Sequence, residues 1–429
     1  MMRTPYLSRL LTQGSAGAVL LVIASASTAQ VAPPASTSDS TQATPTVSGP
    51  ATSVDFTAGL GYATNPLLRG GSDTGSGFGR LSALVSHTVV SERSALRLTA
   101  FGENNTYFSH NGSKQLFALG AHDRYKASEK VSVFGDLGFS SDIGGQLVGR
   151  ILGVPSVPPV IDPGTVLPPP VTIVDPFTID STRRQYRFTG QVGADIALNA
   201  RDSLDVSASG QYAFFQRNGP SSNYSSFSQS VEFRRTLSER TSVGARLTVQ
   251  EANYPGSSNG STLYNPAATV RTRLGEGWDA SLAVGVLIVD RHTLSGNSTK
   301  LSPSVDAALC RTSPSERICA HASHSAQTAS TQGTLTTTSA GVDYFSRLSP
   351  KDTVQASASV LRYSGGNILV PGTGRSTYYT ATGSLDHRFA PRLSAGGELT
   401  FRKVDRSSST IRGDGSAVAF VRYRLGNLR

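Results

Sequence analysis

The chain has 429 residues, of which 16% are charged and 38% hydrophobic, with 43 glycines and only 2 methionines. A soluble enzyme of this size normally carries more charge and more of the helix formers Leu, Glu and Lys. Ser, Thr, Gly and Ala dominate instead, which is typical of short β-strands joined by turns. The formal net charge of +10 is not gathered in basic runs, so we expect no nucleic-acid partner.

Residues 1–29 have the features of a secretory signal peptide. Arg3 and Arg9 make the start positive, residues 18–26 (AVLLVIASA) form a short apolar run, and small residues precede Gln30. We expect cleavage before Gln30 and export to the periplasm. A membrane anchor is disfavoured because the run is shorter than the roughly 20 residues that a spanning helix needs.

The next segment, residues 30–51, is a Pro/Ser/Thr/Ala tract without periodicity, and we expect a flexible periplasmic tail. Residues 52–429 alternate apolar and polar side chains, as in Val54, Phe56, Ala58 and Leu60, and this period of two indicates β-strands. Their longest apolar stretch, residues 282–289, is too short for a membrane-spanning helix.

Short polar turns recur along this alternating region at intervals close to 37 residues, with one doubled interval. They fall at residues 91–93, 128–130, 200–202, 238–240, 275–277, 313–315, 349–351 and 390–392. A longer connection lies between consecutive turns, for example residues 65–77, 217–223 and 364–374. Strands with short turns at one end and long loops at the other are typical of bacterial outer-membrane barrels.

We therefore predict an all-β fold: a closed antiparallel transmembrane barrel of about 18 strands (16–18). Two strands per short turn plus one at each terminus give an even count, and both termini then lie on the periplasmic side. The doubled interval contains a proline-rich extracellular loop at about residues 142–182, in which repeated proline prevents regular strand pairing. This loop either folds into the mouth of the barrel or lies on its surface.

Alternation also predicts which charged residues face the lumen, because a charge facing lipid near the middle of the bilayer is costly. The thirteen lumenal candidates are Arg187, Arg234, Arg246, Arg271, Arg273, Arg347, Arg388, Arg402, Arg422, Asp195, Asp205, Glu232 and Glu398. The same parity gives Asp306, Asp343, Asp386 and Arg424. Arginine is in excess, which favours anions in a pore.

Aromatic residues are predicted to form two girdles at the membrane interfaces. The set near the long loops is Tyr62, Tyr107, Phe108, Tyr186, Tyr212, Phe214, Tyr254, Tyr264, Tyr378 and Tyr379. The set near the short turns is Tyr125, Phe233, Trp278, Phe389 and Tyr423.

Cys310 and Cys319 flank one short turn symmetrically, so a hairpin centred between Pro314 and Ser315 places them directly opposite each other. The periplasm is oxidising, and we predict a disulfide that acts as a staple. His321 and His324 follow, but on a strand they point to opposite faces, so we expect no metal site. No catalytic motif is present, and we expect neither a cofactor nor enzyme activity.

The beginning of the barrel region, GLGYATNPLLRG with Tyr62-Ala63-Thr64-Asn65, followed by alternating runs and the Ser-Glu-Arg turn, resembles the β-barrel porin 2 families of proteobacteria. The resemblance covers roughly residues 54–429. It implies an outer-membrane barrel linked to exopolysaccharide or capsule production. One departure is the C-terminus, which lacks a final aromatic residue, so recognition by the barrel-assembly machinery would depend on Phe420, Tyr423 or Leu425.

The sequence thus predicts a protein of the outer membrane of a Gram-negative cell. Its expected partners are outer-membrane lipids and lipopolysaccharide, the assembly machinery, and an anionic polysaccharide. The preferred function is a porin-like pore or an export accessory. Two alternatives stay open: a closed structural or adhesive surface barrel, and an outer-membrane enzyme such as a lipid hydrolase.

Overall fold

The computed structural model describes residues 51–68, 75–109, 111–143, 184–216, 223–255, 257, 259–293, 296–329, 333–364, 375–406, 409–410 and 412–426. The predicted signal peptide, the tail except its last residue, and nearly all of the proline-rich loop lie outside these residues. The chain divides into the units Met1–Thr46 and Val47–Arg429, and every described residue belongs to the second.

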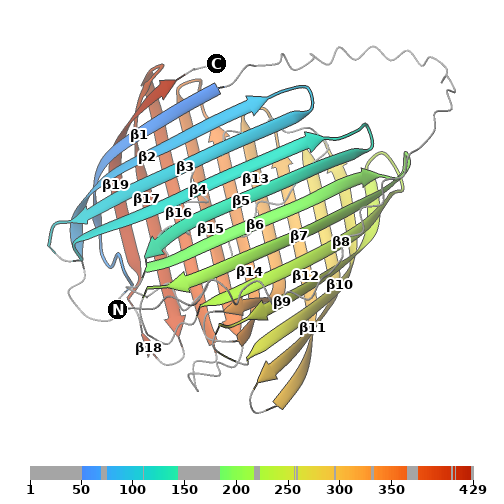
Figure 1. Ribbon diagram of the computed structural model, residues 1–429. Helices are drawn as coiled ribbons and strands as arrows, with labels where there is room; N and C mark the ends of the chain where they lie inside the picture. The colour runs from blue at the N-terminus through green and yellow to red at the C-terminus, as the bar shows by residue number, and fades with distance from the viewer. Residues whose placement is uncertain are drawn as a thin grey trace, which may run out of the picture. The chain divides into compact units, whose positions relative to one another are not determined.

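The second unit is built from antiparallel strands (Figure 1). They are β1 (Ala51–Ala63), β2 (Ser76–Val90), β3 (Ser94–Tyr107), β4 (Ser113–Lys126), β5 (Val131–Ile143), β6 (Arg184–Ala197), β7 (Asp202–Phe215), β8 (Tyr224–Thr236), β9 (Thr241–Asn253), β10 (Gly260–Gly275), β11 (Trp278–Thr293), β12 (Gly296–Thr312), β13 (Glu316–Ala329), β14 (Gly333–Arg347), β15 (Asp352–Ser364), β16 (Arg375–Ala390), β17 (Leu393–Arg406), β18 (Ser409–Thr410) and β19 (Asp414–Gly426). In the described residues, no helix is long and apolar enough to cross a membrane.

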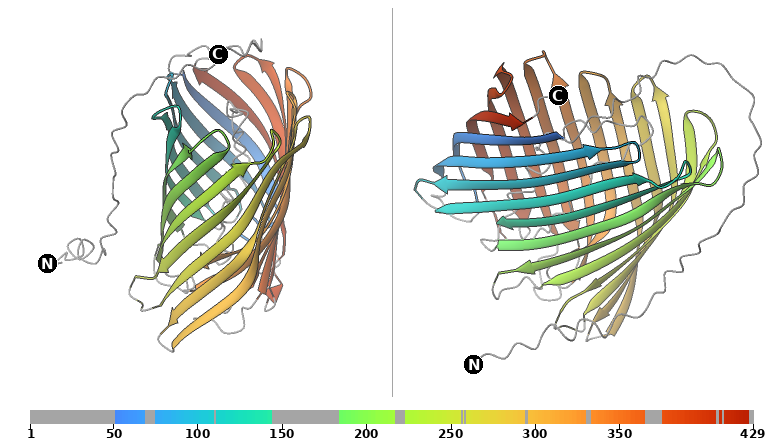
Figure 2. Two further views of the ribbon diagram at one scale, coloured as in Figure 1. Left: turned by 90° about the vertical axis from the view of Figure 1, so that its right-hand side faces the viewer. Right: turned by 45° about the horizontal axis from the view of Figure 1, so that its top comes forward.

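The first and last strands close the sheet into a barrel. Phe56 of β1 lies opposite Ala83 of β2 on one side and opposite Tyr423 of β19 on the other. Figure 2 shows β1 (blue) beside β19 (red) in the continuous wall. The two-residue strand β18 pairs with the end of β17, so eighteen strands make the wall. The predicted closed antiparallel barrel is confirmed.

All eight short turns connect strands where the sequence predicts them. In five of them a serine hydroxyl accepts a hydrogen bond from the backbone N–H three residues further on: Ser91, Ser128, Ser238, Ser313 and Ser349. In the turn after β4, the Ser128 hydroxyl accepts hydrogen bonds from the backbone N–H groups of Lys130 (3.2 Å) and Val131 (3.1 Å). Ser238 does the same for the turn after β8. A serine that bonds the backbone two and three residues further on stabilises a tight turn. We call this end of the barrel the tight-turn end and the other the loop end.

Connections at the loop end vary more in length than the sequence indicates. Five residues (108–112) separate β3 from β4, three (330–332) separate β13 from β14, and only two (294–295) separate β11 from β12. The β11–β12 hairpin, yellow to orange at the lower right of Figure 1, has strands of 16 and 17 residues, and β12 is the longest strand that the structure describes. On this side of the barrel, a short connection is therefore accompanied by long strands.

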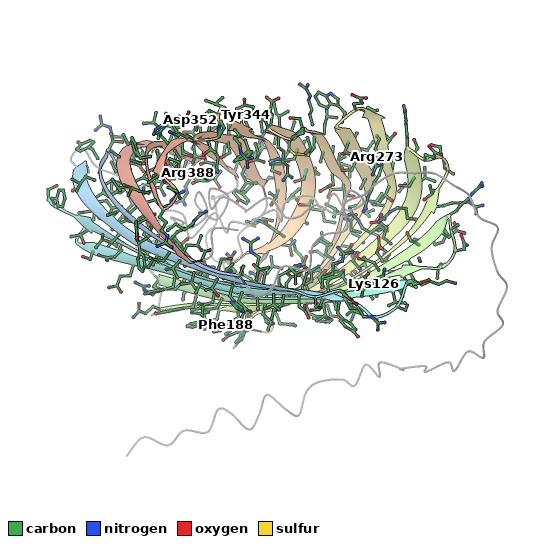
Figure 3. The ribbon with its side chains drawn as sticks, turned by 90° about the horizontal axis from the view of Figure 1, so that it is seen from above. Lys126, Phe188, Arg273, Tyr344, Asp352 and Arg388 are labelled. Carbon is green, nitrogen blue, oxygen red and sulfur yellow. A yellow bond between two sulfur atoms is a disulfide. The ribbon has the colours of Figure 1, made fainter. Side chains whose placement is uncertain are left out.

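The outer face of the wall is apolar. Leu137 in the middle of β5 is 70% exposed, and Leu399 in β17 is 66% exposed. Figure 3 shows Phe188 pointing away from the barrel, while Arg388 points inward. Large apolar side chains exposed around a whole wall do not suit water as the surrounding medium, but they suit lipid.

The aromatic residues at the loop end divide between the two faces. Tyr62 and Phe108 are exposed on the outer face, as predicted for a girdle. Tyr107, Tyr254 and Tyr378 instead face the lumen and are at most 8% exposed, so the girdle prediction is wrong for them. The strand register decides the face of each ring, because it fixes which parity points inward.

Cys310 of β12 and Cys319 of β13 lie directly opposite each other on the inner face and form a disulfide. The hairpin turns between Pro314 and Ser315, as the sequence predicts. Of the residues suggested for assembly recognition, Phe420 is 6% exposed and faces the lumen, so only Tyr423 and Leu425 lie on the outer face.

Candidate functional site

The inner wall of the barrel holds the charged side chains. The strand registers place all thirteen lumenal candidates on the inward parity: Arg187, Arg234, Arg246, Arg271, Arg273, Arg347, Arg388, Arg402, Arg422, Asp195, Asp205, Glu232 and Glu398. The inward side chains of Arg273 and Arg388 are visible in Figure 3. Most candidates belong to one of two groups of ion pairs, which lie on different parts of the wall.

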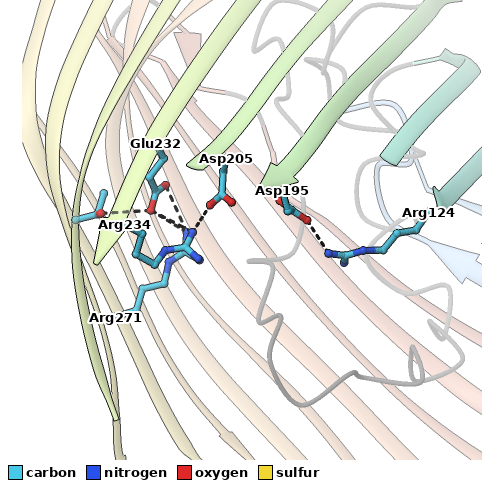
Figure 4. Close-up of polar contacts among 7 residues, drawn as sticks. Arg124, Asp195, Asp205, Glu232, Arg234 and Arg271 are labelled. Carbon is cyan, nitrogen blue, oxygen red and sulfur yellow. Dashed lines mark hydrogen bonds and ion pairs between the residues drawn. The ribbon is translucent and has the colours of Figure 1, made fainter. Parts of the chain in front are cut away.

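The first group is a row of acids that crosses three neighbouring strands. Asp195 of β6 lies opposite Asp205 of β7, and Asp205 lies opposite Glu232 of β8. Adjacent like charges repel, but arginines from β4, β8 and β10 compensate these acids (Figure 4). Arg124 reaches Asp195 at 2.6 Å, and Arg234 bonds Asp205.

Glu232 in this row is fully engaged. Arg271 of β10 lies 3.2 Å and Arg234 lies 3.4 Å from its Oε1, and the Thr269 hydroxyl donates to the same oxygen at 3.3 Å. Arg246 of β9 is directly opposite Glu232 in the register. It nevertheless forms no ion pair with another described residue, because the carboxylate is already occupied.

The second group joins strands on both sides of the closure. The Arg80 guanidinium of β2 binds Glu398 of β17 at 3.0 and 3.2 Å, passing over β1 and β19. Gly61 of β1 contributes to this close packing, since a Cβ there would lie 2.5 Å from the carbonyl oxygen of Ala417. Arg422 binds Asp386 at 3.1 Å nearby.

Residues 64–68, which follow β1, are packed inside the loop end of the barrel. Asn65 is 1% exposed, and Leu68 is 0% exposed in a cluster with Tyr378 and Val404. The backbone turns sharply, with the Leu68 N–H donating to the Asn65 carbonyl and a φ of 49° at Leu68. This segment includes the asparagine of the Tyr-Ala-Thr-Asn element.

A buried ion pair holds this segment. Arg402 Nη2 donates to the Pro66 carbonyl at 2.8 Å and to Asp414 Oδ2 at 2.8 Å. The other oxygen of Asp414 accepts from the Asn65 backbone N–H at 2.9 Å, and the Asn65 side chain donates to the Arg412 carbonyl at 3.0 Å. We call the inward segment and its ion pair the Arg402 lock.

A second inward element is the end of the β13–β14 hairpin. The β12–β13 ladder runs from the tight turn to the pair Val305↔His324 and ends there. Beyond it, β12 continues to pair with β11 and β13 with β14. Among the described residues, the loop-end parts of β12 and β13 therefore separate, at a position marked on β12 by Pro303, a residue that suits an unpaired edge.

The separated hairpin end packs on the inner face of β9–β11. Arg291 Nη2 donates to the Thr334 carbonyl at 2.6 Å, and the Thr334 hydroxyl donates to Ser261 Oγ at 2.7 Å. Gln250 donates to the Thr328 hydroxyl at 3.4 Å. These contacts join strands that are not neighbours in the wall, so the hairpin end crosses into the lumen.

A cavity of about 210 Å³ lies where the two strands separate. Strands β9 to β15 line it, mainly with polar side chains. The lining residues are Arg246, Asn265, Ala283, Ser304, Val305, Asp306, Ser323, His324, Ser325, Ala326, Gln327, Thr337, Ser339 and Leu361. We call it the corner cavity.

Within the described residues, no three His, Cys, Asp or Glu side chains are grouped to hold a metal ion. His321 lies 3.5 Å from Asp343 on the inner face, and His324 bonds Thr338 on the outer face. The two histidines thus point to opposite faces, as alternation predicts.

Sequence reasoning finds the lumenal charges but not the two inward elements or the corner cavity. Alternation predicts which face a residue occupies, whereas the inward elements depend on contacts between distant strands. Two signals were present in the sequence: the Asn65-Pro66 turn before two leucines, and Pro303 within a strand. Neither identifies its partners.

No protein-family model matches the sequence, and no curated protein matches it. The resemblance to the β-barrel porin 2 families therefore stays a prediction. Among solved structures, the barrel is similar to OccK2 (OpdF) of Pseudomonas aeruginosa, with 11% identity, a TM-score of 0.44, and coverage of 89% of this chain and 98% of that one.

Two further solved structures give similar values. The BenF-like porin of Pseudomonas fluorescens Pf-5 has 9% identity and a TM-score of 0.42, with 88% and 99% of the two chains covered. The ferric citrate transporter FecA has 10% identity and a TM-score of 0.40, with 82% of this chain and 60% of FecA covered. Similarities this low carry no argument about the function of the chain.

Proposed function

We propose that this chain is a pore of the bacterial outer membrane that favours anionic solutes. The observation that carries the proposal is the balance of charge on the inner wall. Each of the four candidate acids is paired: Asp195 and Asp205 in the first group, Glu232 between two arginines, and Glu398 with Arg80.

Three of the candidate arginines are not compensated in this way. Arg246, Arg347 and Arg388 form no ion pair with another described residue, so the excess charge of this candidate set is positive. A lumen with fixed positive charge attracts anions and repels cations. The apolar outer face supports a membrane location, because exposed leucines such as Leu137 are stabilised by lipid.

The finer part of the proposal concerns the export of the chain, its assembly and its cargo. Residues 1–29 direct export to the periplasm and are removed. The barrel-assembly machinery then inserts the barrel into the outer membrane, among its lipids and lipopolysaccharide. The cargo in this proposal is an anionic polysaccharide or its building blocks. The support is the uncompensated arginines and the resemblance of the sequence.

Purified protein in planar lipid bilayers tests the pore. We expect stepwise conductance that stays when the protein is reconstituted from different detergents. An inactivated control is the same protein unfolded by heat before addition. Repeated reconstitution of folded protein without any conductance would contradict a pore.

The Arg402 lock and the inward hairpin favour one alternative, a closed barrel with a structural or adhesive role. In that case folded protein gives no current, and removing the inward elements is required to create one. The same bilayer experiment therefore separates the two functions.

A further inference from the structure

The corner cavity contains two charges, Arg246 and Asp306, that no other described residue compensates. Arg246 forms no ion pair among these residues, because Glu232 already binds Arg271 and Arg234. Its Nε atom is buried and has no hydrogen-bond partner within the part of the chain that the structure describes. A buried donor without a partner costs free energy, which a ligand acceptor removes.

Asp306 of β12 is the opposite charge of this cavity. It lies opposite Ala283 of β11 and Ser323 of β13, and neither of these residues carries a charge. It forms no ion pair within the described part of the chain. The cavity thus offers one free cation and one free anion on its wall.

Small side chains make the room between these charges. Arg246 lies opposite Ala267, Ala267 opposite Gly285, and Gly285 opposite Ser304 in one continuous row. A Cβ at Gly285 would lie 2.1 Å from the Pro266 carbonyl oxygen, so only glycine permits this close approach of β10 and β11. The row leads from Arg246 to the edge at which β12 and β13 separate.

Neutral polar groups complete the lining. Thr337 is 5% exposed, and its hydroxyl is buried without a hydrogen-bond partner among the described residues. Ser304 and Asn265 bond each other at 2.8 Å, and Ser323 and Ser339 bond each other at 2.6 Å. Thr337 therefore keeps a free donor and acceptor for a molecule in the cavity.

We propose that the corner cavity binds a small zwitterion with the charge pattern of an α-amino acid. Its carboxylate binds Arg246, its ammonium group binds Asp306, and a hydroxyl or amide binds Thr337. A simple anion leaves Asp306 uncompensated and a simple cation leaves Arg246 uncompensated, whereas a zwitterion pairs both. The volume of about 210 Å³ suits a small solute.

This inference rests on the proposed pore function only for access, because the solute enters the cavity through the lumen. Binding is therefore measured in detergent, without a membrane and without current. A ligand-observed NMR titration compares three probes that share a hydroxyl group. L-serine has both charges, L-glycerate lacks the ammonium group, and ethanolamine lacks the carboxylate.

We expect L-serine to bind at least tenfold more tightly than either of the other probes. Arg246→Gln and Asp306→Asn each remove that preference, and Thr337→Val weakens L-serine binding by a smaller factor. The matched control is Arg388→Gln, which removes another lumenal arginine without an ion pair and leaves L-serine binding unchanged. Migration of unheated protein on gels verifies that each variant is folded.

Equal binding of L-serine and L-glycerate, or equal losses in Arg246→Gln and Arg388→Gln, would overturn the zwitterion site. So would an absence of L-serine binding by folded protein. Conductance without L-serine binding removes the site and leaves the pore, while L-serine binding without conductance does the reverse.

Discussion

At the residue scale, some charged side chains of the inner wall form ion pairs, and others form none with a described residue. Arg402 and Asp414 are 7% and 1% exposed; they bond each other and hold residues 64–68 through two further hydrogen bonds, to Asn65 and Pro66. Breaking a buried pair by removing one partner is strongly destabilising, because it leaves an uncompensated charge. We therefore expect a single neutral substitution in the Arg402 lock to be strongly destabilising.

Asp414→Asn is expected to lower the free energy of unfolding by about 3–5 kcal/mol, because it leaves the Arg402 guanidinium buried without a counter-charge. Urea unfolding of the barrel in lipid vesicles measures the change. The control is Asp386→Asn, whose partner Arg422 lies at a similar distance but is 26% exposed, and which should cost clearly less. Equal effects of the two variants would show that burial does not set the strength of the lock.

Removing the Cys310–Cys319 disulfide is expected to cost about 2 kcal/mol, because the closed loop is short and the hairpin ladder already restricts it. A Cys310→Ser/Cys319→Ser variant should fold, with a lower urea midpoint than the oxidised protein. Reductant should lower the midpoint of the wild type and leave that of the variant unchanged. A midpoint of the wild type that does not respond to reductant would contradict a stabilising disulfide.

At the element scale, strands and tight turns follow from local rules, and the inward elements do not. Alternation fixes the face of Phe56 or Leu247, and a serine such as Ser238 fixes a turn through its own hydroxyl. The inward β13–β14 hairpin instead depends on Arg291 meeting Thr334, which lies on a strand three positions away in the wall. Tyr378 likewise faces inward against Leu68, which only the folded chain brings near it.

The inward hairpin predicts a cross-link between strands that are not neighbours. In a chain without native cysteines, a short bismaleimide should link Gln250→Cys to Thr328→Cys, because the wild-type side chains of these two residues meet, with 3.4 Å between Gln250 Nε2 and Thr328 Oγ1. Gel migration with and without the bismaleimide detects the link. The control pair Gln250→Cys and Thr338→Cys should not be linked, since Thr338 faces outward. A cross-link in the control, or none in the first pair, would contradict the inward position.

At the scale of the whole molecule, the barrel sorts its side chains: apolar ones face the lipid, and charged ones face the lumen. Eighteen wall strands pair all around, and the apolar set faces out at every height. The charged set faces in; among the described residues, the four candidate acids are paired, whereas Asp306 and several arginines form no ion pair. The sequence alone was sufficient for this sorting, since it depends only on strand parity and on the closure of the sheet.

The sorting predicts that one charge has opposite consequences on the two faces. Leu137→Arg places a guanidinium on the outer face in the middle of β5 and should cost about 2–4 kcal/mol of unfolding free energy in vesicles. Thr189→Arg, on the inward parity of β6 at nearly the same height, should cost much less. Equal costs on the two faces would mean that the outer face is not in contact with lipid.

In the proposed function, the lumen is a conducting path whose free arginines favour anions. The most direct measurement is the reversal potential of the bilayer current under a KCl gradient, for the wild type and for Arg246→Gln/Arg347→Gln/Arg388→Gln. We expect the reversal potential of the wild type to lie toward the chloride equilibrium potential, and that of the triple variant to shift toward zero. A cation-selective wild type, or a triple variant with unchanged selectivity, would contradict this function.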